Sequence, residues 1–284
     1  MRASPLHLAH AFFAVTSISL VPICVTMVTA DVIVIGTIRL IIAVTGVLLF
    51  LLYNKTLLSL SFAQWRAISL IGLLFGAHWI TFFLSIKLST PSIAAIGIST
   101  YGIHIILFNW RLVGKRPNSR NLLVIAMAIL GSLIAIPELS IKNSHTQGLL
   151  IGIASGFFYA LVPIVHQQNR HISNGMRTLA QFSVALVLFL LLTPWGNWDF
   201  SSSDWPLLIF MGIVCTLIGH ALWVSASTHL PIQIISAIFY LGLPFTLLFE
   251  VLLLGKGIVL TTMIGAALIL IANFINIDWR KQNE

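Results

Sequence analysis

Long apolar runs separated by short polar connectors dominate this chain and decide what it can fold into. Hydrophobic residues make up 58% of its 284 residues and charged residues only 8%, and the mean hydropathy is +1.03. An ordinary soluble domain is about one quarter charged and could not bury this much apolar surface. The pattern excludes a soluble enzyme, a secreted disulfide scaffold and a disordered chain. It indicates a protein whose main solvent is lipid.

Each apolar run is close to the ~20 residues that a helix needs to cross a bilayer. Lipid cannot hydrogen-bond free backbone groups, so each run is expected to be a helix. We predict an all-α membrane protein with ten transmembrane helices. Their predicted ranges are 7–28, 32–53, 66–87, 91–112, 119–138, 147–167, 176–195, 206–228, 231–254 and 259–278.

The net charge of +8 is distributed in the way that orients a membrane protein. With the N-terminus inside, eleven lysines and arginines fall in inner connectors and ends, and only Lys87, Lys142 and Lys256 fall outside. This asymmetry predicts a multi-pass protein of the cell inner (plasma) membrane with both termini cytoplasmic. It gives no phosphate-binding face, so no nucleic-acid partner is expected.

The chain repeats itself at about half its length. The motif at Leu20–Ile23 recurs at Leu161–Ile164, a shift of 141 residues. The other repeated positions are Trp65, Gly72, Ser85 and Pro91 with Trp205, Gly212, Ser225 and Pro231, at a shift of 140, and Gly114-Lys115 with Gly255-Lys256, at a shift of 141. The predicted repeats are residues 1–142 and 143–284.

Five helices in each repeat is an odd number, so the second repeat would enter the membrane from the opposite side. An inverted repeat has two nearly equivalent arrangements, one open to each face, which is the basis of alternating access. The alternative is a duplicated membrane scaffold that transports nothing.

The chain resembles the drug/metabolite transporter superfamily, specifically its EamA-like branch. The resemblance rests on the two five-helix halves, the Ile38-Arg39-Leu40 motif followed by Ala43, the Gly-rich third and eighth helices, and the Pro-led fourth and ninth. It implies a central cavity walled by the first, third, fourth, sixth, eighth and ninth helices. Where this family often has Gly-Glu, the chain has Gly-Lys at Lys115 and Lys256, so no role of that acid is carried over.

Polar and aromatic residues near the middle of these helices are the candidate substrate-binding residues, because polar groups at that depth need protein or water around them. They are His78, Trp79, Tyr101, His104, Tyr159, His220, Trp223 and Tyr240. Aromatic walls favour a small organic substrate with an apolar or cationic part. For the histidines the alternative is a structural hydrogen bond between helices, and for the tryptophans it is lipid packing. No metal-ligand spacing occurs, and no metal or cofactor is expected.

Two charged residues stand apart from these inside the predicted helices, Arg39 and Glu250, both in the outer half. We predict that they pair, or that Arg39 alone with backbone carbonyls stabilises one access state. A second interpretation makes Arg39 an anion ligand and Glu250 a proton site, and a third lets both snorkel to the interface. Pro22 and Pro163 are candidate hinges, with static kinks as the alternative.

These features predict a secondary transporter, not an enzyme, that moves a small metabolite such as an amino acid or amine, coupled to protons or to exchange. The family resemblance implies export. No Walker-type phosphate loop is present to support ATP hydrolysis. The alternatives are an importer of a quaternary amine or nucleotide-like metabolite, an intramembrane enzyme, and a channel. The oligomeric state is open between monomer and homodimer.

Overall fold

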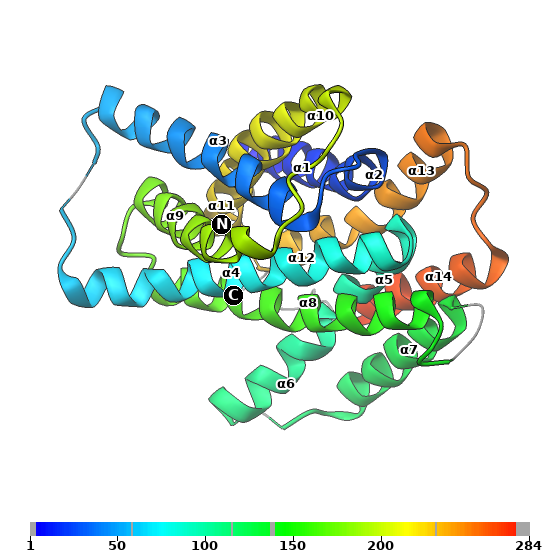
Figure 1. The fold of residues 1–284 in the computed structure, drawn as a ribbon. Helices are drawn as coiled ribbons and strands as arrows, with labels where there is room; N and C mark the ends of the chain where they lie inside the picture. Colours follow the sequence, from blue (N-terminus) through cyan, green and yellow to red (C-terminus); the bar gives the residue numbers. More distant parts are fainter. Residues whose placement is uncertain (1–3, 58, 115, 137–139, 231, 277–284) are drawn as a thin grey trace.

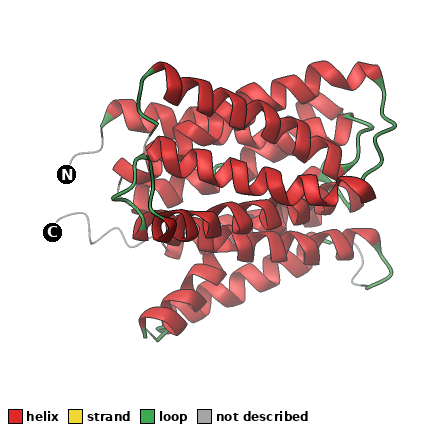
Figure 2. Cartoon of the chain, turned by 60° about the vertical axis from the view of Figure 1, so that its left-hand side comes forward, coloured by secondary structure: helices red, strands yellow, loops and turns green. Residues whose placement is uncertain are grey.

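The computed structural model is all-helical over the residues it describes, which are 4–57, 59–114, 116–136, 140–230 and 232–276. Figures 1 and 2 show long helices that run side by side through the molecule. Within the described residues, eight helical segments of 18–28 residues are long and apolar enough to cross a membrane. The prediction of an all-α, multi-pass membrane protein is therefore confirmed.

Two further apolar helices, Ser119–Ala135 and Leu260–Ile275, are shorter than these eight. The predicted spans 119–138 and 259–278 end on residues outside the described part of the chain. Lys115 and Pro231 of the repeated motifs also lie outside it. The count of ten spans stays a prediction.

Among the described residues, six helices are continuous, and four other helical segments are interrupted along their length. The continuous helices are α3 (Val32–Tyr53), α4 (Phe62–Leu88), α7 (Ser119–Ala135), α8 (Ser144–Gln168), α9 (Asn174–Leu192) and α14 (Leu260–Asn276). The interrupted segments are α1 (Pro5–Ser19) with α2 (Val21–Met27), α5 (Pro91–Ser99) with α6 (Tyr101–Val113), and α12 (Ile232–Tyr240) with α13 (Gly242–Leu254). In the fourth, a π-helix, η3 (Met211–Ile218), joins α10 (Trp205–Phe210) to α11 (Gly219–His229).

Side-chain caps fix where several helices begin. The carboxylate of Asp31 accepts a hydrogen bond from the backbone N–H of Ile33 (2.8 Å) and starts α3 at the predicted residue. Ser61 and Gln64 form a capping box, so α4 begins at Phe62, four residues before the predicted start. The capping box, in addition to the apolar run, determines where this helix begins.

Glycines let the central helices approach closely, as their small-residue spacing predicts. A Cβ atom added at Gly152 of α8 would lie 3.0 Å from Ser85 Oγ of α4, and one at Gly156 would lie 3.1 Å from the carbonyl oxygen of Ile98 in α5. The shorter helices α7 and α14 meet in the same way, with a Cβ at Gly131 only 2.7 Å from the carbonyl oxygen of Gly265.

The two interruptions at Thr100 and Leu241 are related by the repeat spacing. Thr100 separates α5 from α6, and Leu241 separates α12 from α13 141 residues later. This is the shift found between the repeated motifs, and it agrees with repeats at 1–142 and 143–284. The inverted relation of the two halves remains a prediction.

Replacing Gly97 with alanine is expected to destabilise the fold. The new Cβ would lie 2.7 Å from Gly152 Cα, a backbone atom that cannot move aside cheaply. Overpacking of this kind costs roughly 1–3 kcal/mol, so the variant should unfold at a lower temperature in detergent than the wild type.

The matched control is Gly257→Ala, because a Cβ there meets nothing within 4 Å. Equal unfolding temperatures for Gly97→Ala and Gly257→Ala would contradict the close packing of α5 on α8.

Candidate functional site

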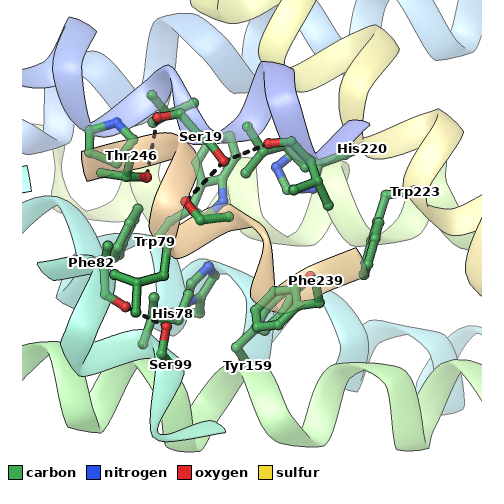
Figure 3. A pocket seen from close by; sticks show the side chains of 18 of the residues that line it. Ser19, His78, Trp79, Phe82, Ser99, Tyr159, His220, Trp223, Phe239 and Thr246 are labelled. Atoms are coloured by element: carbon green, nitrogen blue, oxygen red, sulfur yellow. Dashed lines mark hydrogen bonds between the residues drawn. The ribbon is translucent and has the colours of Figure 1, made fainter. Parts of the chain in front are cut away.

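A cavity lies at the centre of the bundle, where the interrupted segments meet the continuous helices (Figure 3). The centre of a water molecule can occupy about 80 Å³ of it. By the same measure one water needs about 10–15 Å³. The space is therefore large enough for several waters or a small ligand group. Its walls come from α1, α2, α4, α5, α8, α11, α12 and α13, the segments that the family resemblance implies, and Arg39 of α3 adds one more.

The lining combines polar groups with a larger set of aromatic and aliphatic side chains. The polar and aromatic members are Ser19, Arg39, His78, Trp79, Phe82, Phe83, Ser99, Tyr159, His220, Trp223, Phe239 and Thr246. Neither aspartate nor glutamate is among the residues that line it.

Interrupted backbone is concentrated around this cavity. The break at Leu20 lies beside the lining residues Ser19 and Val21, and the break at Leu241 lies beside Gly242. At Leu20 and Leu241 the backbone keeps right-handed helical angles but tightens, because the N–H of each residue bonds the carbonyl oxygen three residues earlier (3.2 and 3.1 Å). The breaks and the cavity are therefore parts of one arrangement.

One wall of the cavity is a continuous aromatic surface. Tyr159 and Phe239 stack with ring centroids 5.3 Å apart, and Trp223 packs on Phe239 at 5.9 Å. On the other side of Tyr159, the ring of His78 lies at 4.7 Å. Figure 3 shows these side chains around the open space. The wall brings α4, α8, α11 and α12 together and gives the cavity a flat apolar face.

Arg39 is 1% exposed and reaches the cavity from α3. Its Nε donates to Thr216 Oγ1 (3.0 Å), and this hydroxyl in turn donates to the carbonyl oxygen of Met211 in the π-helix (2.8 Å). The guanidinium stacks over Trp79, 4.2 Å from the ring centroid, and lies 5.1 Å from that of Phe83. Its Nη1 is buried without a hydrogen-bond partner among the described residues.

His78 is held in a defined protonation form by Ser155 of α8. Ser155 Oγ donates its single proton to the backbone carbonyl of His78 (3.1 Å), so it can only accept from His78 Nδ1, 2.7 Å away. In the neutral ring, Nδ1 therefore carries the proton and Nε2 is an acceptor. The predicted alternative of an interhelical hydrogen bond is realised for this histidine, which also lines the cavity.

His220 lies among aromatic rings and, like Arg39, is next to Trp79. Its ring is perpendicular to Phe75 with centroids 5.0 Å apart, and it lies 5.8 Å from Trp79. Trp79 thus touches both Arg39 and His220, and it joins α3, α4 and α11 at the cavity.

Three predicted binding residues do not line the cavity. Tyr101 and Tyr240 are buried behind its wall, with the ring of Tyr101 4.8 Å from Phe239 and 6.1 Å from Tyr240. The ring of His104 does not face the cavity. It packs edge-on against Phe157, with ring centroids 5.6 Å apart. The break at Thr100 separates the end of α5, which lines the cavity, from α6, which carries Tyr101 and His104.

Arg39 and Glu250 are not joined in this structure. The carboxylate of Glu250 accepts hydrogen bonds from the backbone N–H of Ser92 (2.9 Å) and from Ser92 Oγ. It therefore ties α13 to the first turn of α5, where a negative charge is favourable. The predicted coupling role of the two residues remains a prediction.

The two candidate hinge prolines differ in their surroundings. Pro22 lines the cavity and follows the break at Leu20, within the first turn of α2. Pro163 lies inside α8, which continues as a helix through it. Only Pro22 coincides with an interruption of the chain.

Several lining residues carried no signal that sequence reasoning used. Phe239, Phe82 and Phe83 look like ordinary apolar span residues, and Ser19 and Thr246 look like scattered hydroxyls. Of these five, Ser19 and Phe239 stand within two residues of a helix break.

Removal of the Thr216 hydroxyl is expected to destabilise the protein. Thr216→Val takes away the acceptor of Arg39 Nε and leaves a second buried guanidinium donor without a partner. A buried unsatisfied donor costs about 1–3 kcal/mol, so the unfolding temperature in detergent should fall.

Thr261→Val is the matched control, since this threonine is exposed on α14. If both valine variants unfolded at the same temperature, the hydrogen bond from Arg39 would contribute nothing.

Comparison with known proteins agrees with this architecture. Residues 146–277 match the model of the EamA-like transporter family. An uncharacterized transporter from Archaeoglobus fulgidus is 23% identical over 237 residues, which cover 80% of this chain and 81% of the relative. A solved crystal structure shares the fold with a TM-score of 0.70 at 16% identity, over 95% of each chain. The predicted resemblance to this family is confirmed.

Proposed function

We propose that this EamA-like chain is a secondary transporter that exports a small organic metabolite, an amino acid or amine, by alternating access driven by protons or by exchange. The match to a transporter family and the homologous uncharacterized transporter support membrane transport. The substrate, the direction and the coupling are our proposal.

The central cavity is the observation that carries this function. It is lined from the first half of the chain by α1 to α5 and from the second half by α8 and α11 to α13. A site between two halves is what alternating access requires, because a relative movement of the halves exposes it to one side and then to the other. The breaks at Leu20 and Leu241 provide places where such movement can be absorbed.

Contacts between the two halves of the chain lie at both ends of the segment formed by α1 and α2. Beyond the end of α2, the carboxylate of Asp204 accepts from the backbone N–H and the hydroxyl of Thr29, both at 2.8 Å, and from the N–H of Ala30 at 3.0 Å. At the beginning of α1, His7 stacks on His229 of α11 with centroids 4.4 Å apart. Opening either side of the cavity would require the contacts at that end to separate.

Counterflow in proteoliposomes tests the proposed transport. Vesicles loaded with unlabelled phenylalanine or phenethylamine should accumulate the same labelled compound faster than empty vesicles. Phe239→Ala should weaken the apparent affinity about tenfold, because the lost aromatic contact is worth about 1.5–3 kcal/mol.

Phe274→Ala, on an exposed side chain of α14, should leave counterflow unchanged. Uptake without acceleration by internal substrate would indicate a channel, and chemical alteration of the label would indicate an enzyme.

Glu250 is the proposed proton-coupling residue. Its carboxylate holds α5 to α13 through Ser92, and protonation would remove the charge that favours this contact. Glu250→Gln should therefore abolish the response of transport to an imposed pH gradient while exchange at equal pH persists.

Asp199→Asn, in an exposed connector, is the control and should keep the response. A Glu250→Gln protein with an unaltered response to the gradient would exclude this residue from coupling.

A further inference from the structure

Among the described residues, two arginines are almost completely buried, and their surroundings differ. Arg177 donates from Nε to the carbonyl oxygen of Ile172 (3.0 Å), from Nη1 to that of His166 (2.9 Å), and from Nη2 to Asn174 Oδ1. Arg39 makes its one hydrogen bond within the described residues from Nε, and Nη1 has no partner. The two groups are 2% and 1% exposed, so burial does not explain the difference.

The charge of Arg39 also lacks a counter-ion among the described residues. No carboxylate lines the cavity. Three of the described carboxylates already accept hydrogen bonds elsewhere: Asp31 caps α3, Asp204 binds Thr29 and Ala30, and Glu250 binds Ser92. An unpaired charge inside a membrane protein is costly and is typical of a functional site. A negatively charged ligand group in the cavity would remove this cost.

Aromatic stacking restricts the direction from which such a group can approach. Trp79 and Phe83 lie 4.2 Å and 5.1 Å from the centre of the guanidinium, and because their ring centroids are only 5.2 Å apart, both rings cover the same side of it. Thr216 occupies the Nε position, which leaves the Nη1 edge for a ligand. Because Trp79 already has Arg39 as its cation, this part of the cavity is not a cage for a ligand amine.

We propose that Arg39 binds the carboxylate of the transported molecule, whose apolar part lies against the aromatic wall of Tyr159, Trp223 and Phe239. This inference rests on the proposed transport function and narrows its substrate class to small molecules that carry a carboxylate and an apolar body. Charge-assisted hydrogen bonds from a guanidinium fit a carboxylate better than any neutral group. Inorganic anions such as chloride share the charge and are tested separately.

Binding of simple aromatic compounds to the purified full-length protein tests the assignment. In low-salt buffer, phenylacetate should bind at least about tenfold more tightly than the isosteric neutral phenylacetamide, since a charged hydrogen bond contributes about 1.5–3 kcal/mol. Arg39→Gln should weaken phenylacetate binding at least about tenfold and leave phenylacetamide binding unchanged. Arg111→Gln, at an exposed site in α6, should alter neither affinity.

The comparison of acid and amide in the wild type keeps the test decisive even if Arg39→Gln does not fold. Equal affinities for phenylacetate and phenylacetamide would overturn the proposal. Binding of chloride that depends on Arg39, without binding of phenylacetate, would also overturn it in favour of an inorganic anion. Tight binding of phenethylamine that survives Arg39→Gln would refute the carboxylate site while leaving the transport function intact. Counterflow measured on the same preparation reports on transport independently.

Discussion

The architecture depends on the requirement that every backbone polar group in lipid finds a partner within the protein. A lipid-exposed break in a helix would leave several such groups unsatisfied, each at a cost of several kcal/mol. The breaks at Leu20 and Leu241 lie instead beside residues that line a central cavity. The same constraint that makes the chain helical thus keeps these breaks inside the protein, beside the cavity that forms the candidate site.

Within the site, Arg39 connects features that are far apart in the sequence. Its Nε is held by a threonine of the π-helix, Trp79 and Phe83 cover one side of the guanidinium, and Nη1 has no hydrogen-bond partner among the described residues. The hydrogen-bonded His78 adds a neutral acceptor to the aromatic wall, beside Tyr159. A cavity that holds a positively charged donor and a neutral acceptor can distinguish the two ends of a polar ligand.

Apolar run length and capping residues made the helices predictable, because both act locally. Asp31 begins α3 where expected, and the Ser61 capping box starts α4 four residues earlier than expected. The candidate site was less predictable, because depth along a span does not give direction. His78 and His104 have similar predicted depths, yet the break at Thr100 turns His104 towards Phe157. The pairing of Glu250 with Ser92 could not be foreseen, since it depends on how α13 packs against α5.

The π-helix between α10 and α11 alters how this part of the sequence should be read. A helix with i→i+5 bonds turns through a smaller angle per residue than an α-helix does. A helical wheel drawn through Trp205–His229 at about 100° per residue therefore turns too far before it reaches α11. His220 and Trp223 project from the helix at azimuths that such a wheel misassigns. Deleting one residue of Met211–Ile218 would restore the regular winding and rotate both rings away from the cavity that they line.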